Sequence, residues 1–270
     1  MKLFLSADIE GTAGIDTWDE ATLGENKYSY FASQMTKEVA AACSAAGRCG
    51  VQVTVKDAHD SARNIDPASL PENAGLIRGW IKDLWCMMGG IDRDKYDYAA
   101  FTGYHSDAMS DGNPLSHTMT RSVQRVLING KYASEFTINA YMAGYLGIPV
   151  IFLSGDKALC ESAKEFIPGI RTVAAKEGIG GAVLARHPQK VCDEISEVME
   201  EAIKFASTEE GRRACTVKMP EHFRISVEYK EWVKAYNNSF YPNAKLDDAK
   251  TVTYESDDYM DIMRFMHFCL

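Results

Sequence analysis

The sequence contains no long hydrophobic run and no excess of positive charge. The apolar stretch at Leu3–Leu5 meets acidic residues a few positions later, so it is too short for a signal-peptide core or a membrane span. Aspartate and glutamate number 38 against 29 lysines and arginines, which gives a net charge of −9, and no basic cluster is interleaved with aromatic residues. This balance argues against nucleic acid or an anionic membrane as the main partner, and we expect a cytoplasmic protein.

Motifs for redox, nucleotide and serine-hydrolase chemistry are also absent. None of the seven cysteines forms a CxxC pair, and most lie among apolar neighbours, which is typical of reduced core residues. The turn Gly11–Gly14 only weakly imitates a dinucleotide-binding GxGxxG, and the acids before it would repel a pyrophosphate. There is no P-loop and no GxSxG elbow. A cysteine–histidine nucleophile pair stays open, although no cysteine lies at the end of an expected strand.

The hydrophobic pattern predicts an α/β fold. A strand at residues 3–7, a helix at 28–46 and a β-branched strand at 51–55 follow one another through short joints, which predicts a βαβ unit and a parallel sheet. For residues 1–187 we therefore predict a mostly parallel sheet flanked by helices. Its further elements are strands at 74–77, 96–102, 150–153 and 171–175, a short helix at 82–88, a hairpin around Asn129-Gly130, and helices at 135–146 and 157–166.

The last third of the chain has a different pattern. Pro188 opens a long amphipathic helix, and a polar connector follows at residues 207–213. Apolar and polar residues alternate over 223–229, which predicts a strand with one solvent-exposed face. Further predicted elements are a strand at 251–254 and a final helix capped by Ser256. We predict a smaller α+β domain at residues 188–270, which would serve oligomerisation or complete a pocket.

Two carboxylates follow the first strand one residue apart. In extended chain the side chains at i and i+2 share a face, so Asp8 and Glu10 are expected to point the same way. Two like charges at the end of a buried strand repel unless a cation lies between them, and a divalent metal is the commonest such cation. The alternative is a pair of solvated acids in a loop.

Histidines follow two further strands. His59 and His105 stand just past the expected strands at 51–55 and 96–102, and the carboxyl edge of an open α/β sheet is where sites form. His117 lies in a loop soon afterwards, which favours a functional role. Glu135 opens a helix, where the helix dipole favours a carboxylate with or without a metal. The remaining histidines, at a helix start, on a wet strand face and in the terminal helix, are His187, His222 and His267.

These side chains form a candidate metal site. Carboxylates and imidazoles together suit zinc, manganese or similar ions. Five ligands are too many for one tetrahedral zinc with an open position, but they suit two ions that share a bridging carboxylate and a bridging water. The candidate ligands are Asp8, Glu10, His59, His105 and Glu135.

Five motifs in register give the chain a resemblance to a known family. Ser6-Ala7-Asp8-Ile9-Glu10-Gly11 resembles the SxDxEG signature of the zinc-dependent D-aminopeptidases of the dipeptide-transport-operon type. The resemblance covers nearly the whole chain and is strongest over residues 1–156. The other motifs are similar to the family's D-x-H, GYH, SHSM and E-x-x-x-N-A-Y, and they are Asp57–His59, Gly103–His105, Ser116–Met119 and Glu135–Tyr141.

The resemblance implies a function for these residues. It implies two zinc ions per chain held by the five candidate ligands, with Asp8 as the bridge, and His117 as the catalytic histidine. The reaction implied is hydrolysis of the N-terminal residue from short D-amino-acid peptides such as D-Ala-D-Ala. A metal-activated water would attack, while His117 would handle a proton or the developing oxyanion. The family further implies a homo-oligomeric ring, a decamer, with sites facing an internal chamber.

Two departures from the family pattern concern substrate identity. Lys157 stands where the family often has a second aspartate, and Gly180-Gly181 replaces a stretch that usually carries an arginine. Either departure could alter the substrate pocket or the subunit contacts. Three alternatives stay open: a hydrolase at the same metal site acting on L-peptides, amides or modified peptides, a binding protein with a structural metal, and a nucleotide-binding domain.

Overall fold

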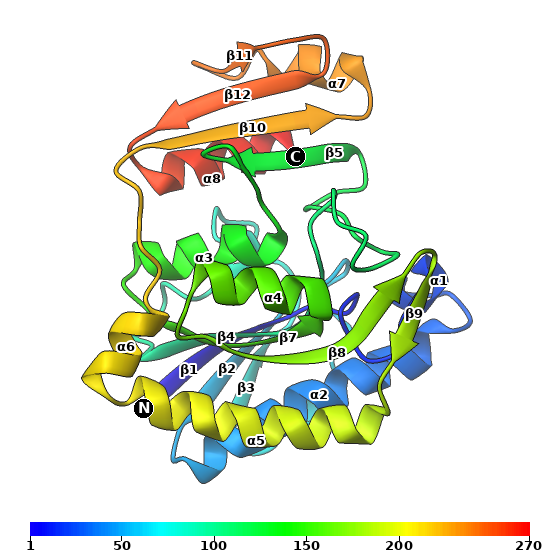
Figure 1. Ribbon diagram of the computed structural model, residues 1–270, viewed down its shortest axis with the longest axis vertical. Helices are drawn as coiled ribbons and strands as arrows, with labels where there is room; N and C mark the ends of the chain where they lie inside the picture. Colours follow the sequence, from blue (N-terminus) through cyan, green and yellow to red (C-terminus); the bar gives the residue numbers. More distant parts are fainter.

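The computed structural model describes residues 1–270 as two sheets connected by helices (Figure 1). The larger sheet has seven strands in the order β3-β2-β1-β4-β7-β8-β9. All neighbours pair in parallel except β8 and β9, so the predicted mostly parallel sheet is confirmed. Its strands are β1 (Lys2–Ala7), β2 (Gln52–Asp57), β3 (Ala74–Ile77), β4 (Tyr98–Tyr104), β7 (Val150–Asp156), β8 (Arg171–Ile179) and β9 (Ala182–Ala185).

The strand order reverses between β1 and β4. From β1 the chain builds outward through β2 to β3, and it then returns to the other side of β1 and builds outward again from β4 through β7 to β9. Such a topological switch point leaves a crevice at the carboxyl ends of the two central strands. Asp8 and Glu10 follow β1, and His105 follows β4, so three candidate ligands lie at this crevice.

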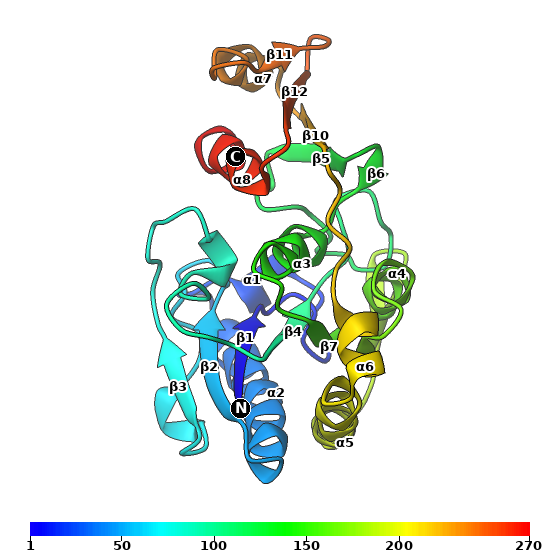
Figure 2. The ribbon, with the colours of Figure 1, turned by 90° about the vertical axis from the view of Figure 1, so that its left-hand side faces the viewer.

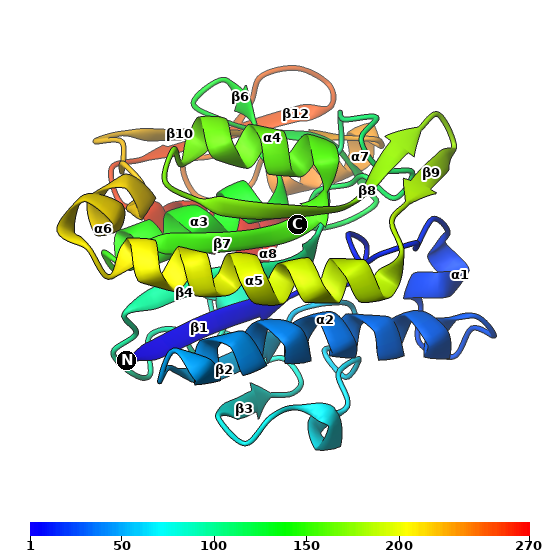
Figure 3. The ribbon, with the colours of Figure 1, turned by 60° about the horizontal axis from the view of Figure 1, so that its bottom comes forward.

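Helices cover both faces of the larger sheet. Figure 3 shows α2 (Tyr28–Arg48) and α5 (Pro188–Ala206) side by side on one face, where Leu3 and Leu5 of β1 join their core. The alternate residue Phe4 joins the second core on the opposite face, which holds α3 (Glu135–Tyr145) and α4 (Lys157–Phe166). This alternation is what the apolar pattern of the first strand predicts.

The smaller sheet is antiparallel and has the order β11-β12-β10-β5-β6. The predicted hairpin at Asn129-Gly130 is confirmed as β5 (Val123–Ile128) and β6 (Lys131–Tyr132). Figures 1 and 2 show this sheet beyond α3, on the side of the molecule away from α2 and α5. Its other elements are β10 (Phe223–Tyr229), α7 (Trp232–Asn238), β11 (Lys245–Leu246), β12 (Thr251–Ser256) and α8 (Tyr259–Cys269).

The elements interleave across the predicted boundary between residues 187 and 188. The helix α5 packs against β8 and α2 of the larger sheet, while β5, from the first part of the chain, pairs with β10. As folding units, the ranges 1–187 and 188–270 stay a prediction.

Several local predictions were wrong. The expected helix at 82–88 is only a 3-10 turn, η2 (Cys86–Met88). The final helix is capped by Asp258 instead of Ser256, and the Asp258 side chain accepts a hydrogen bond from the Met260 amide. The predicted polar connector at residues 207–213 leads into a helix, which begins after Thr208 because the Thr208 side chain accepts from the Gly211 amide and caps the first turn. Short elements that the sequence analysis did not predict are α1 (Trp18–Ala21), η1 (Pro67–Ser69), α6 (Glu209–Cys215), α7, β9 and β11. No helix is both long and apolar enough to cross a membrane.

Candidate metal centre

Two glycines bring the loop after β1 against the end of β4. A Cβ on Gly11 would lie 1.8 Å from the carbonyl oxygen of Tyr104, and one on Gly103 would lie 2.2 Å from that of Asp8. Gly103 also has a φ of +67°, which glycine adopts at little cost. The Asp8 and Gly11 amides donate to the Thr102 and Gly103 carbonyls, so the acidic loop is held beside the strand that leads to His105.

Asp8 and Glu10 are buried and point the same way, which contradicts the alternative of two solvated acids. Each has an exposed fraction of 2%. The Nδ1 atom of His59 lies 3.2 Å from Asp8 Oδ1 and 3.0 Å from Glu10 Oε2. The other ring nitrogen of His59 donates to the Ala21 carbonyl at 2.8 Å, so Nδ1 is the nitrogen that faces the two acids and would bind a metal ion in the neutral ring.

His105 lies on the other side of Asp8. Its Nε2 is 3.6 Å from Asp8 Oδ2 and 3.5 Å from Glu135 Oε2, while its Nδ1 donates to the Ser106 carbonyl. Glu135 is the first residue of α3, after the Ser134 cap whose side chain accepts from the Thr137 amide. Its placement therefore follows from the helix start that the sequence predicts.

Asp8 thus belongs to two groups of potential ligands. Asp8, Glu10 and His59 form one, and Asp8, His105 and Glu135 form the other, with the ligand atoms of each group within 4.8 Å of one another. Three atoms facing this space are buried without a hydrogen-bond partner, namely Asp8 Oδ2, Glu10 Oε2 and His105 Nε2. Buried polar atoms normally have partners, so this donor set fits bound metal ions.

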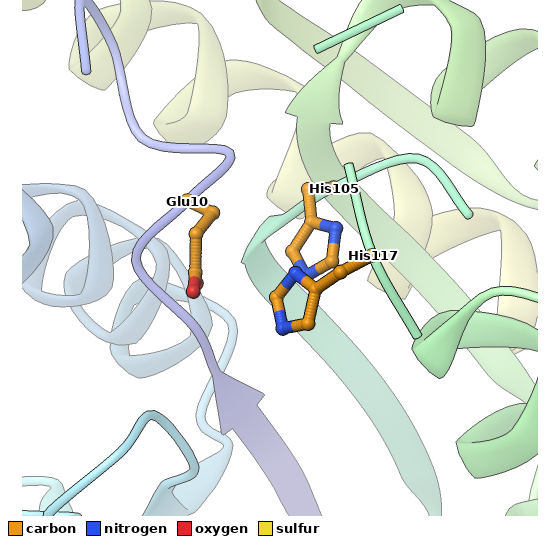
Figure 4. A group of neighbouring side chains, drawn as sticks. All are labelled: Glu10, His105 and His117. Carbon is orange, nitrogen blue, oxygen red and sulfur yellow. The ribbon is translucent and has the colours of Figure 1, made fainter. Parts of the chain in front are cut away.

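His117 lies at the rim of the same space. Its ring stacks on His105 with a centroid distance of 4.4 Å and an interplanar angle of 10°, and its Nε2 is 3.4 Å from Glu135 Oε1. Figure 4 shows Glu10 across from these two rings, and the three residues form a third possible ligand group. His117 is more exposed than His105, with 15% of its side chain accessible against none. Its Nδ1 donates to the Leu115 carbonyl, so Nε2 is the free nitrogen.

The charges of the cluster shift its pKa values in opposite directions. Burial and the neighbouring Glu10 charge raise the pKa of Asp8 well above its usual range. Burial lowers the pKa of His117, and the His105 charge adds to that effect. Burial lowers the pKa of His105, but the charge and hydrogen bond of Glu135 together with the charges of Glu10 and Asp8 outweigh it and raise the pKa to about 10. The buried acids therefore need positive charge beside them, which protonated histidines supply here and metal ions would supply in their place.

Three residues of the sequence motifs meet beneath the cluster. The Tyr104 hydroxyl lies 2.7 Å from Ser6 Oγ and accepts from the Asn139 amide at 3.1 Å, which links β1, β4 and α3. Ser6 donates to the Met87 carbonyl. These residues support the cluster without contacting its open space, and a similar role belongs to Asp57, which accepts from the Asn64 and Ile65 amides.

The six candidate residues lie around one cavity of about 450 Å³, and all except His105 belong to its lining. Ala58 and Met119, which belong to two of the sequence motifs, also line it. The sequence analysis missed the other residues of the wall, because they come from loops and short turns with no periodicity. These are Trp18, Thr22, Asp60, Trp80, Cys86, Met87, Thr120 and Arg121. Burial raises the pKa of the Cys86 thiol to about 11, so this cysteine is a poor nucleophile.

The two departures from the family pattern lie outside the cavity lining. Lys157 forms an exposed ion pair with Glu177, and Gly180 occupies the turn between β8 and β9. The other three histidines are also outside it, with His187 capping α5 and His222 pairing with Asp257.

Comparisons with known proteins show the family to which the chain belongs. A family model described as D-aminopeptidase matches residues 1–268. A D-aminopeptidase of Bacillus subtilis is 29% identical over 269 residues, which cover 98% of this chain and 95% of the relative. The structure is also similar to that of the Zn-dependent D-aminopeptidase DppA from Bacillus subtilis, which is described as a self-compartmentalizing protease. The two structures superpose with a TM-score of 0.90 at 27% sequence identity, and the match covers 100% of this chain and 96% of that one. The resemblance indicated by the five motifs is confirmed, and the chain is an enzyme that belongs to the D-aminopeptidase family.

Proposed function

We propose that this protein is a two-zinc aminopeptidase that removes the N-terminal residue from short D-amino-acid peptides such as D-Ala-D-Ala. The observation that carries the proposal is the position of Asp8, whose two oxygens face two separate ligand groups. One zinc would be held by Asp8, Glu10 and His59, and the other by Asp8, His105 and Glu135. Similarity to a zinc-dependent D-aminopeptidase supports both the metal and the substrate class.

The ligand groups and the cavity have separate tasks. Bound zinc supplies a Lewis acid that polarises a peptide carbonyl and lowers the pKa of a coordinated water. His117 offers its free Nε2 at the rim, where it can take up or return a proton or donate to a developing oxyanion. A cavity of about 450 Å³ suits a peptide of two or three residues, which supports short substrates.

We also propose a homo-oligomeric ring, with ten chains as the expected number. Apolar side chains are exposed together on and after α7, where Trp232, Tyr236 and Phe240 have exposed fractions of 60%, 53% and 70%. Tyr236 and Phe240 are in edge-on contact. An exposed apolar patch of this kind is typical of subunit interfaces. A mass near ten times the 30.0 kDa of one chain, measured by light scattering, would agree with a decamer. The cytoplasmic location stays a prediction.

Parallel assays of D-Ala-D-Ala and L-Ala-L-Ala on the zinc-loaded protein test the proposed substrate class. We expect release of alanine from the D-peptide at a much higher kcat/KM than from the L-peptide. A preference for the L-peptide would contradict the proposed specificity, although the proposed metal site would still stand. Hydrolysis of neither peptide while zinc stays bound would favour a binding protein with a structural metal.

A further inference from the structure

The cavity has a single positively charged side chain that is not a histidine. Among its 15 lining residues, Arg121 is the only arginine or lysine, whereas Asp8, Glu10, Asp60 and Glu135 are acidic. Arg121 forms no ion pair within the protein. An unpaired cation in an acidic cavity is available to an anionic group of a ligand.

Arg121 is held at this wall by an aromatic ring. Its guanidinium carbon lies 4.4 Å from the ring centroid of Trp18, a distance typical of a cation–π contact. The same indole meets His117 edge-on, with ring centroids 5.3 Å apart. The Trp18 indole therefore contacts both the Arg121 guanidinium and the candidate catalytic histidine.

The loop that carries His117 and Arg121 is held against the candidate metal centre by hydrogen bonds. The Met119 amide, two residues before Arg121, donates to Glu135 Oε1 at 2.7 Å, and Met119 has a φ of +63°. The Thr118 hydroxyl donates to the Ala133 carbonyl. These bonds anchor the segment that carries His117, Met119 and Arg121 beside Glu135.

A short peptide carries a charge at each end, and the lining offers a partner for each. In the proposed two-zinc enzyme Asp8, Glu10 and Glu135 hold zinc, which leaves Asp60 as the lining carboxylate free to attract the ammonium group of the peptide. The peptide carboxylate lies one or two residues beyond the scissile bond, at no more than about 3.6 Å per residue, and it needs a cationic side chain on the same wall. Arg121 is the only side chain of the lining with a permanent positive charge.

We propose that Arg121 binds the free C-terminal carboxylate of the substrate and thereby restricts the enzyme to short peptides with an unmodified C-terminus. The proposal rests on the aminopeptidase function proposed above. Trp18 positions Arg121, because the face of the indole ring orients the guanidinium group. Two parallel N–H donors suit a carboxylate better than the single ammonium of a lysine.

Kinetics on two matched substrates test the proposal. On the zinc-loaded protein we expect D-alanyl-D-alanine to exceed D-alanyl-D-alaninamide in kcat/KM by about 10- to 100-fold, mainly through KM, which is the effect of one charge-assisted hydrogen-bonded pair. Arg121→Gln should remove this preference, so that the ratio of kcat/KM between the free acid and the amide falls to about one. Arg121→Lys should retain part of the preference.

A matched control variant and a binding measurement complete the test. Arg93 is exposed, lies outside the cavity lining and forms no ion pair, so Arg93→Gln should keep the full preference. A dipeptide analogue with a methylene group in place of the scissile carbonyl cannot be hydrolysed. Calorimetry on the intact enzyme should show that its free acid binds about 10- to 100-fold more tightly than its amide, and that Arg121→Gln abolishes this difference.

The outcomes separate this inference from the function on which it rests. If the unmodified protein releases alanine from both peptides equally well, or if Arg121→Gln keeps the preference for the free acid, the role of Arg121 is wrong and the aminopeptidase function stands. If the unmodified protein hydrolyses neither peptide, the proposed function fails, and this inference fails with it.

Discussion

His105 and His117 stack face to face with their ring planes 10° apart, and each presents its Nε2 to a different oxygen of Glu135. The pair combines a fully buried imidazole with one at the rim of the cavity. A backbone carbonyl accepts from the Nδ1 of each ring, which leaves the Nε2 of each ring facing the cluster. We therefore propose that the inner ring binds metal and the outer ring handles a proton.

Replacing the outer histidine tests that assignment. We expect His117→Ala to lower kcat on D-Ala-D-Ala by about 10²- to 10⁴-fold, the range for loss of a general acid or base, while zinc content stays unchanged. Steady-state kinetics and elemental analysis of the same sample check both parts. Loss of zinc in this variant would instead place His117 among the ligands, in the group with Glu10 and His105.

Removing the shared carboxylate should affect both metal positions. Asp8→Asn removes the negative charge that both ligand groups share and replaces one carboxylate oxygen by an amide nitrogen, so we expect a loss of most of the zinc, whereas His59→Ala should mainly empty one position. Asp60→Asn is the matched control, because Asp60 lines the cavity but belongs to no ligand group. Equal zinc loss in Asp8→Asn and His59→Ala would contradict a bridging role for Asp8.

The close approach of β1 and β4 should tolerate no side chain at Gly11. A methyl group there would lie 1.8 Å from the Tyr104 carbonyl oxygen, so Gly11→Ala must displace the acidic loop from β4. We expect a loss of about 3 kcal/mol in the free energy of unfolding, measured by urea titration, together with weaker zinc binding. Gly75→Ala, on β3 with open space around it, should leave both quantities nearly unchanged.

A buried carboxyl outside the site predicts a pH-dependent stability. Burial raises the pKa of Glu38 to about 7 from the usual 4.5, so the folded protein retains this proton in a range where the unfolded chain loses it. The resulting stability is fully present below pH 4.5 and is lost as the pH rises through 7. Glu38→Gln cannot ionise and should gain up to about 3 kcal/mol over the original protein between pH 4.5 and pH 8.5. Urea titrations at both pH values measure this difference, and a constant difference would contradict it.

The parts of the fold that the sequence predicts are those with strong local signals. The strand at residues 3–7 alternates between two cores, Ser134 caps α3, and Asn129-Gly130 makes a hairpin. Because parallel strands end at one edge, the positions of Asp8, His59 and His105 follow from strand order alone. The family resemblance added the roles of Glu135 and His117, which the helix dipole and loop position leave open.

The cavity wall could not be predicted in this way. Trp18 and Arg121 are 103 positions apart in the chain and meet only through tertiary structure. Neither belongs to a periodic element or motif, so a single sequence carries no signal for their contact. The placement of α5 against the larger sheet was missed for a similar reason, since its apolar stripe does not indicate which sheet it covers.

The zinc content of the purified protein is the most direct test of the two-metal centre. Elemental analysis after exhaustive dialysis should give about two zinc ions per chain, because Asp8 belongs to two groups of three potential ligands. Removal of this zinc with a chelator should abolish hydrolysis of D-Ala-D-Ala, and adding zinc back should restore it. A protein that is fully active with no bound metal would contradict the assignment of Asp8, Glu10, His59, His105 and Glu135 as ligands.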